Sequence, residues 1–170
     1  GEEYIIPTLG IWGSFDEIDF DKLPKQFVLK VTHDSGGLVI CKDKKYLDIE
    51  NARKKIEKSL KANYYLRCGR EWPYKDVPHK IIAEKYMVDE SGTELKDYKF
   101  FCFDGEPKFV LVVSGREGVT KRYIYDTSWT RIPVALHGDK IPSPGEMAKP
   151  TNFDEMLSLA RKLSKGMVHL

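Results

Sequence analysis

The chain has 170 residues, of which 41% are hydrophobic and 12% aromatic, so it can bury a core and does not belong to the intrinsically disordered class. Its 28 basic and 26 acidic residues leave a formal net charge of +2, which excludes the strongly basic footprint of a dedicated nucleic-acid-binding domain. The longest purely apolar run, 109–113, is far shorter than the ~20 residues that span a bilayer.

The beginning of the chain and its cysteines indicate a cellular compartment. No basic segment followed by an apolar one opens the sequence, and Cys41, Cys68 and Cys102 show no C-x-x-C spacing. This pattern predicts reduced, packed thiols and a cytoplasmic protein. Because the first residue is Gly and residues 166–170 read as the start of a strand, we expect a piece of a longer protein.

The first third of the chain predicts a connector followed by a hairpin. Residues 1–24 are polar and acidic and are expected to lie against the domain as a connector. Residues 26–31 and 38–42 are short β-rich runs, and the polar stretch 33–37 between them contains two glycines. Two such runs joined by a five-residue loop with glycine predict a β-hairpin.

A helix is predicted over residues 49–64. Asp48 is a suitable N-cap, and Ile49, Ala52, Ile56 and Leu60 recur at helical spacing. The basic residues between them are expected to form a solvated face rather than a partner site.

The second half of the chain predicts strands and one more helix. Runs of period two at 80–87, 96–103, 108–114 and 119–126 are separated by Gly-containing turns, which favours an antiparallel meander. A long loop rich in Pro is expected over 133–150. A helix follows, with Asn152 as cap, Glu155 completing a capping box and Gly166 ending it. The order predicts an α+β fold of two small lobes, a hairpin with a helix and a meander with a helix.

The common catalytic patterns are absent from the sequence. His33, Asp34 and Ser35 are consecutive, so their side chains cannot converge as a relay. The four histidines have no metal-ligand spacing, and no G-x-S-x-G, G-x-G-x-x-G or G-x-x-x-x-G-K-[ST] motif occurs.

Two groups of residues have the chemistry of a nucleotide site. Lys30 ends an apolar run, and residues 35–37, Ser-Gly-Gly, offer backbone N–H groups without Cβ atoms in the way of a phosphate chain. An ordinary hairpin turn is the alternative interpretation of that loop.

The second group lies further along the chain. Glu84 interrupts an apolar strand, where a carboxylate must be paired or hydrogen-bonded. Asp97 and Lys99 are two residues apart and therefore face the same side of a strand. A cross-strand ion pair between Glu84 and Lys99 is the alternative interpretation.

Five segments together resemble a known family. They are L-P-K-Q-F-V-L-K at 23–30, H-D-S-G-G at 33–37, R-E-W-P-Y at 70–74, I-A-E-K-Y at 82–86 and D-Y-K-F-F-C-F-D-G at 97–105. They resemble the TupA-like ATP-grasp proteins of bacterial teichuronopeptide and cell-surface polysaccharide biosynthesis, over nearly the whole chain from about residue 5 to residue 163.

The resemblance implies an ATP-grasp fold with a connector (1–24), a first lobe (25–78) and a second lobe (79–170) that is incomplete at its C-terminus. It implies that Lys30 contacts ATP phosphates below a mobile loop. It implies that the segment 84–87 meets adenine through backbone groups, and that Asp97 and Lys99 line the nucleotide side of the second lobe. The cofactor-binding residues that we expect are Lys30, Ser35, Gly36, Gly37, Glu84, Lys85, Tyr86, Met87, Asp97 and Lys99.

The resemblance also implies a reaction. A carboxylate–amine ligase would activate a carboxylate with ATP as an acyl phosphate, which an amine attacks; a glycosyltransferase label would suit the same pathway. ATP and Mg²⁺ are the implied cofactors, with the metal ligands expected beyond Leu170, so the chain alone is expected to bind ATP weakly and not to turn it over. The implied substrate is a surface-polymer precursor or an amino acid. Apolar surface exposed along residues 167–168 would also allow two copies of the chain to form a homodimer.

A binding module for an anionic polymer or a partner protein is the alternative. Its surface would combine aromatic and basic side chains, provided that these aromatics are not simply core residues. The candidates are Trp72, Tyr74, Tyr123, Tyr125, Trp129, Lys121, Arg122 and Arg131.

Overall fold

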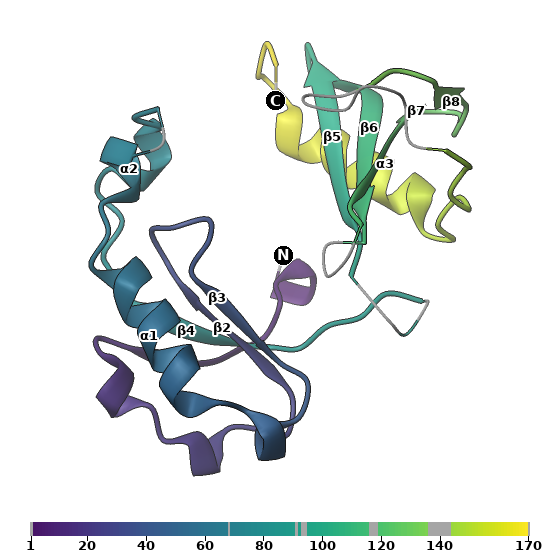
Figure 1. Ribbon diagram of the computed structural model, residues 1–170. Helices are drawn as coiled ribbons and strands as arrows, with labels where there is room; N and C mark the ends of the chain where they lie inside the picture. The colour runs from purple at the N-terminus through teal and green to yellow at the C-terminus, as the bar shows by residue number, and fades with distance from the viewer. Residues whose placement is uncertain are drawn as a thin grey trace. The chain divides into compact units, whose positions relative to one another are not determined.

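The computed structural model describes residues 2–67, 69–90, 92, 95–115, 119–135 and 144–169. The chain forms two compact units, Gly1–Met87 and Val88–Leu170 (Figure 1). Each unit has a four-stranded antiparallel sheet with a helix packed on it. The predicted α+β class is therefore confirmed.

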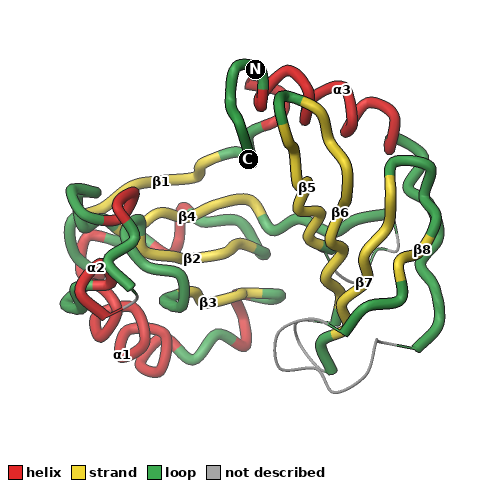
Figure 2. The backbone as a smooth tube through the Cα atoms, turned by 90° about the horizontal axis from the view of Figure 1, so that it is seen from above, coloured by secondary structure: helices red, strands yellow, loops and turns green. Residues whose placement is uncertain are grey.

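The sheet of the first unit has the strand order β1-β4-β2-β3, which can be followed in Figure 2. Its strands are β1 (Thr8–Trp12), β2 (Phe27–Val31), β3 (Leu38–Cys41) and β4 (Ile81–Lys85). The predicted hairpin is confirmed, with Phe27 opposite Cys41 and Lys30 opposite Leu38. Alternate residues of β2 point into the core, where they meet Ala52 and Ile56 of helix α1 (Ile49–Leu60).

The place of β4 corrects the sequence-based interpretation. Residues 80–87 were expected to open the meander of a second lobe beginning at residue 79, but β4 pairs with β2 and with β1 in the first sheet. Ile81 and Ala83 are buried in the core of this unit. Period-two alternation identifies a strand but not the strands beside it. Strand β1, which pairs with β4, lies within residues 1–24, the stretch expected to be a connector.

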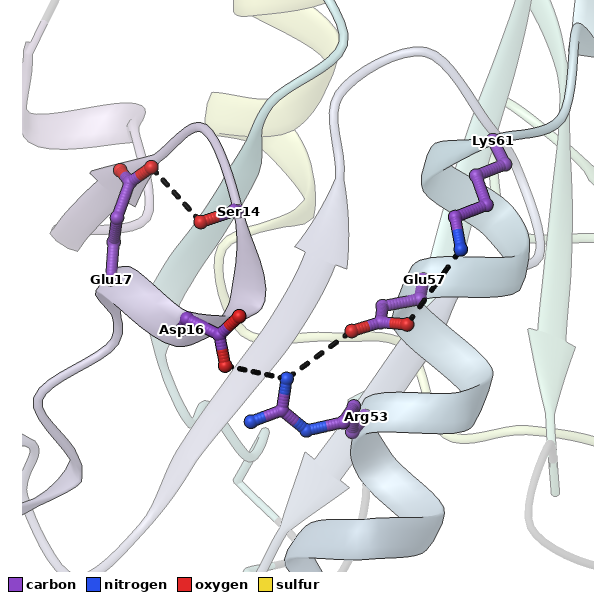
Figure 3. Close-up of polar contacts among 6 residues, drawn as sticks. All are labelled: Ser14, Asp16, Glu17, Arg53, Glu57 and Lys61. Carbon is purple, nitrogen blue, oxygen red and sulfur yellow. Dashed lines mark hydrogen bonds and ion pairs between the residues drawn. The ribbon is translucent and has the colours of Figure 1, made fainter.

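An arginine of α1 holds the N-terminal segment against the helix (Figure 3). The Arg53 guanidinium contacts Asp16 at 2.7 Å and Glu57 at 3.2 Å, and it lies over the ring of Phe15. The hydrogen bond with Asp16 raises the pKa of Arg53. This member of the expected solvated basic face therefore fixes the segment 15–17 to the fold.

Helix α1 is shorter than predicted. Asp48 caps it as expected, since its Oδ1 accepts from the N–H of Asn51 at 2.9 Å. The helix ends at Leu60 instead of residue 64, because the side chain of Asn63 accepts from the N–H of Leu66 and begins a new helix, α2 (Tyr64–Arg67). Short 3-10 helices of this unit are Glu2–Tyr4, Phe15–Glu17, Phe20–Lys22, Lys44–Tyr46 and Trp72–Tyr74.

The second unit is a meander covered on one face by α3 (Phe153–Ser164) (Figure 2). Its strands, in spatial order, are β5 (Asp97–Phe103), β6 (Glu106–Ser114), β7 (Lys121–Asp126) and β8 (Arg131–Ile132). Phe153 lies in the core with Val110 and Tyr125. The helix ends before Gly166, as predicted, and this glycine has a φ of 80°. The side chain of Asn152 at the other end makes no capping hydrogen bond, so that part of the predicted capping box is wrong.

Three further expectations concern thiols, membrane spans and loops. Cys41 and Cys102 are buried free thiols, and burial raises the pKa of Cys41. Within the described ranges, no helix is long and apolar enough to cross a membrane. Cys68, part of the turns near 91–94 and 116–118, and the segment 136–143 of the long loop lie outside the described residues.

A buried ion pair predicts a pH dependence of the second unit. The side chains of Lys96 and Asp89 contact each other and are 12% and 8% exposed. Burial opposes the charge of Lys96, but the hydrogen bond and ion pair with Asp89 outweigh it and raise the pKa of Lys96. The ion pair therefore makes its full contribution to the free energy of unfolding at pH values below about 10.4, the pKa of lysine in the unfolded chain. This contribution is lost as the pH rises through the pKa of Lys96 in the folded protein.

We expect the free energy of unfolding to fall more steeply above about pH 10.5 in the wild type than in Lys96→Met. Urea titrations of both proteins between pH 8 and pH 11 measure this difference. Equal slopes in the two proteins would show that the pair contributes no pH dependence.

Candidate functional site

Lys30 and Glu84 lie together on the face of the first sheet opposite α1. Phe27, Leu29 and Val31 of β2 point into the core, so the alternation of the strand places Lys30 on the other face. The register sets Lys30 opposite Ile82, two residues from Glu84 on β4. The Lys30 Nζ lies 2.8 Å from the Glu84 Oε2, and the side chains are 40% and 15% exposed.

This contact bears on the alternative interpretation of Glu84, an ion pair with Lys99. The carboxylate is paired, as a charge in an apolar strand requires, but its partner is Lys30 and not Lys99. Lys99 lies on β5 of the second sheet, whereas Glu84 lies on β4 of the first. The alternative of a cross-strand pair between Glu84 and Lys99 is therefore wrong, and the structure joins Lys30 and Glu84, two site candidates that the sequence left separate.

The loop between β2 and β3 begins directly after Val31. Its Asp34 Oδ1 accepts from the N–H of Gly36 at 2.9 Å, and the N–H of Leu38 bonds the carbonyl of Gly36 at 3.0 Å. Within the described ranges, the N–H groups of Ser35 and Gly37 donate to no other residue. Two backbone N–H groups of the loop are thus unused within the described residues; that of Ser35 belongs to an exposed residue and that of Gly37 to a buried one, while the third is used by Asp34.

The two glycines of this loop are present for different reasons. A Cβ on Gly37 would lie 2.1 Å from the Oγ and 2.4 Å from the Cβ of Ser59 on α1, so close packing requires glycine there. A Cβ on Gly36 would meet only the Asp34 Oδ1, at 3.8 Å. Neither residue has a positive φ. No contact of the described residues therefore requires glycine at position 36, and the space beside its Cα is open.

A pair of histidines anchors the base of the loop, and sequence reasoning missed it. The rings of His33 and His79 stack at 3.5 Å with an interplanar angle of 6°. His33 Nε2 lies 2.9 Å from the carbonyl of Ala62, and His79 Nδ1 lies 3.1 Å from that of Leu60. The stack therefore fixes the loop to the end of α1; no local pattern indicates it, because its members lie on distant segments.

The segment after Glu84 carries the residues expected at the adenine. Lys85 ends β4, and its N–H donates to the carbonyl of Pro7 at 3.0 Å, so this donor is already occupied. Tyr86 and Met87 follow in a non-helical, half-buried stretch. The groups of this segment that we still expect at a base are the carbonyl of Lys85 and the N–H of Met87.

Asp97 and Lys99 belong to the second unit and lie on the face of β5 opposite α3, because Tyr98, Phe100 and Cys102 point toward the helix side. Lys99 is exposed and Asp97 is half-buried. Leu111 is opposite Lys99, and Phe101 is opposite Phe109. This face of the second sheet therefore combines apolar side chains with charged ones, which include Asp97, Lys99 and Arg122, the residue opposite Val113.

The structure corrects part of the alternative of an aromatic and basic binding face, since Trp72 is exposed but the two tyrosines of β7 are buried. Tyr123 and Tyr125 are 4% and 1% exposed, and both belong to the core beside Phe153. Trp129 stacks on Tyr125 and its Nε1 donates to the carbonyl of Met147. Tyr123 and Tyr125 are core residues and the half-buried Trp129 packs against them, so a polymer cannot stack on Tyr123 or Tyr125.

The described residues can be compared with the two implied cofactors, ATP and a metal ion. Lys30, the N–H group of the exposed Ser35 and the open position of Gly36 suit an anionic phosphate chain. No group of three His, Cys, Asp or Glu side chains in the described residues can hold a metal ion. The residues at the end of β2 therefore have the chemistry that a phosphate chain requires.

Comparison with known proteins identifies a family. A family model described as TupA-like ATPgrasp matches residues 1–170, the whole chain. The same comparisons found no matching curated protein and no matching solved structure.

Proposed function

The chain belongs to the TupA-like ATP-grasp family, and from this premise we propose that it is the ATP-binding part of an ATP-dependent carboxylate–amine ligase of bacterial surface-polymer biosynthesis. The nucleotide phosphates lie at Lys30 and the loop 35–37, and the adenine lies at the segment 84–87. Asp97 and Lys99 are included on the family resemblance alone.

The observation that supports this proposal most is the combination at the end of β2. A lysine lies one residue before the end of the strand, and the loop that follows has two N–H groups without a partner in the described chain. The same loop has a glycine that the fold does not need. An ammonium has three N–H donors, so the ion pair with Glu84 leaves others for phosphate oxygens.

The proposed reaction transfers the terminal phosphoryl group of ATP. A carboxylate oxygen of the acceptor bonds to the γ-phosphorus as the bond to the β,γ-bridging oxygen breaks and ADP leaves. An amine then attacks the acyl carbon, phosphate leaves, and the amine proton passes to solvent. Since nucleophile and phosphoryl group are both anionic, donors and cations at the loop serve to offset their charge.

Nucleotide binding separates this function from polymer binding. A ligand that binds only the folded chain stabilises it by about 2.7 kcal/mol at 100 times its Kd, so ATP is expected to raise the melting temperature by several degrees. An acidic polysaccharide is expected to leave it unchanged. A rise with the polysaccharide and none with ATP, measured by differential scanning fluorimetry, would contradict the proposal.

A further inference from the structure

A pocket of the first unit lies between the β2–β3 loop and helix α2, beside the proposed phosphate site. It has a volume of about 350 Å³ and is lined by Asp34, Ser35, Gly36, Tyr64 and Arg67. Figure 1 shows the loop and α2 at the same end of this unit. A pocket of this size accommodates a small anionic group.

The walls of the pocket are held by specific contacts. The side chain of Asn63 caps the N–H of Leu66 at 3.1 Å, and the ring of Tyr64 packs edge-on against Tyr74, with the centroids 4.8 Å apart. On the loop side, His33 bonds the carbonyl of Ala62, one residue before Asn63. The β2–β3 loop and helix α2 are therefore both hydrogen-bonded to the adjacent residues 62 and 63. These two contacts set the position of Arg67 relative to Ser35.

The charges near the loop single out Arg67. Lys30 is partly neutralised by Glu84 at 2.8 Å. Arg67 is exposed and forms no ion pair with another described residue. A polyphosphate carries several negative charges, and one lysine already shared with a carboxylate offsets few of them. Arg67 is the cation in this pocket that is not yet paired.

The chemistry of the lining suits a tetrahedral oxyanion. A guanidinium offers a planar fork of N–H donors that binds two phosphate oxygens at once. Ser35 adds a hydroxyl and a backbone N–H, and Gly36 presents no Cβ toward the pocket. The Asp34 carboxylate opposes an anion, although its Oδ1 is engaged by the N–H of Gly36.

We infer that Arg67 and Ser35 bind the terminal phosphate of the nucleotide in this pocket, so that α2 supplies a second phosphate-binding cation besides Lys30. This inference rests on the proposed function for the identity of the ligand. It predicts that phosphate-chain affinity depends on Arg67, whereas adenine recognition does not.

The test measures binding of tripolyphosphate, ATP and AMP to the full chain by calorimetry. Arg67→Ala is expected to lower the affinity for tripolyphosphate and for ATP by at least about tenfold, since one charge-assisted contact is lost. Its affinity for AMP is expected to equal that of the wild type. Arg67→Lys keeps the positive charge but loses the planar pair of N–H donors. Its affinity for tripolyphosphate should therefore lie between those of the wild type and Arg67→Ala. Lys55→Ala removes one positive charge from the exposed side of α1 and should change nothing.

A further variant tests the sign of the charge at Asp34. Asp34→Asn retains an oxygen that can accept from Gly36 and removes the negative charge from the pocket, so tripolyphosphate should bind more tightly. Melting temperatures of all variants are measured in parallel, because the exposed Arg67 is expected to be replaceable without loss of the fold.

The outcomes separate this inference from the proposed function. If Arg67→Ala binds tripolyphosphate as tightly as the wild type, or if the wild type does not bind it, the inference is wrong. If binding of tripolyphosphate depends on Arg67 but ATP binds no more tightly than tripolyphosphate, Arg67 belongs to a polyphosphate site, and the nucleotide as its ligand fails together with the proposed function.

Discussion

Replacing Lys30 by Met is expected to weaken ATP binding by about 10- to 100-fold, because a charge-assisted hydrogen bond to phosphate contributes roughly 1.5–3 kcal/mol. Methionine keeps most of the aliphatic length of the side chain and removes the charge. The expected cost in stability is small, about 1 kcal/mol or less, since the ion pair with Glu84 is partly exposed on the lysine side.

A double variant separates binding from folding. Lys30→Met with Glu84→Gln removes the carboxylate that the single change leaves unpaired, so it should recover any lost stability but not ATP affinity. Lys55→Met is the matched control for the loss of one charge on an exposed lysine. If Lys30→Met binds ATP as the wild type does, Lys30 is not at the phosphates and the hairpin is scaffold only.

The two glycines of the loop are expected to respond in opposite ways to the same change. Gly37→Ala places a Cβ 2.1 Å from the Ser59 Oγ and 3.0 Å from a methyl group of Val31. Such overpacking costs about 1–3 kcal/mol, a fall of roughly 2–10 °C in melting temperature for a chain of this size. Gly36→Ala should leave the melting temperature unchanged and weaken ATP binding instead, because its Cβ would stand where phosphate approaches.

Ser59 supplies the control for the packing argument. Its hydroxyl is buried and has no hydrogen-bond partner in the described residues, so Ser59→Ala should be neutral or slightly stabilising. Combined with Gly37→Ala it removes the 2.1 Å contact but not the 2.4 Å contact with the Ser59 Cβ, so recovery should be partial. An unaltered melting temperature in Gly37→Ala would contradict the packing argument, and unaltered ATP affinity in Gly36→Ala would remove the loop from the site.

The hairpin and the two charged positions were predictable because their signals are local. Alternating apolar residues around a Gly-containing loop identify β2 and β3, and a single charge inside each of two apolar runs draws attention to Lys30 and Glu84. Their pairing was not predictable. It depends on β4 returning to lie beside β2 after α1 and α2, and spacing along the chain does not record that return.

The parts of the site that the sequence did not predict arise from contacts between distant segments. The His33–His79 stack brings together the loop and the stretch before β4. Arg67 reaches the pocket because Asn63 begins a new helix where α1 was expected to continue. Strand β1 was missed because its residues are mostly exposed at the edge of the sheet, without the alternation that identifies a buried strand.

The most direct test of the account is the location of bound ATP, measured by titrating a ¹⁵N-labelled chain and following its amide resonances. ATP is expected to shift the amides of Ser35, Gly36 and Gly37 together with that of Met87, and tripolyphosphate to shift the loop amides alone. Absence of shifts at 35–37, or shifts confined to the second unit, would contradict the assignment of the β2–β3 loop as the phosphate site.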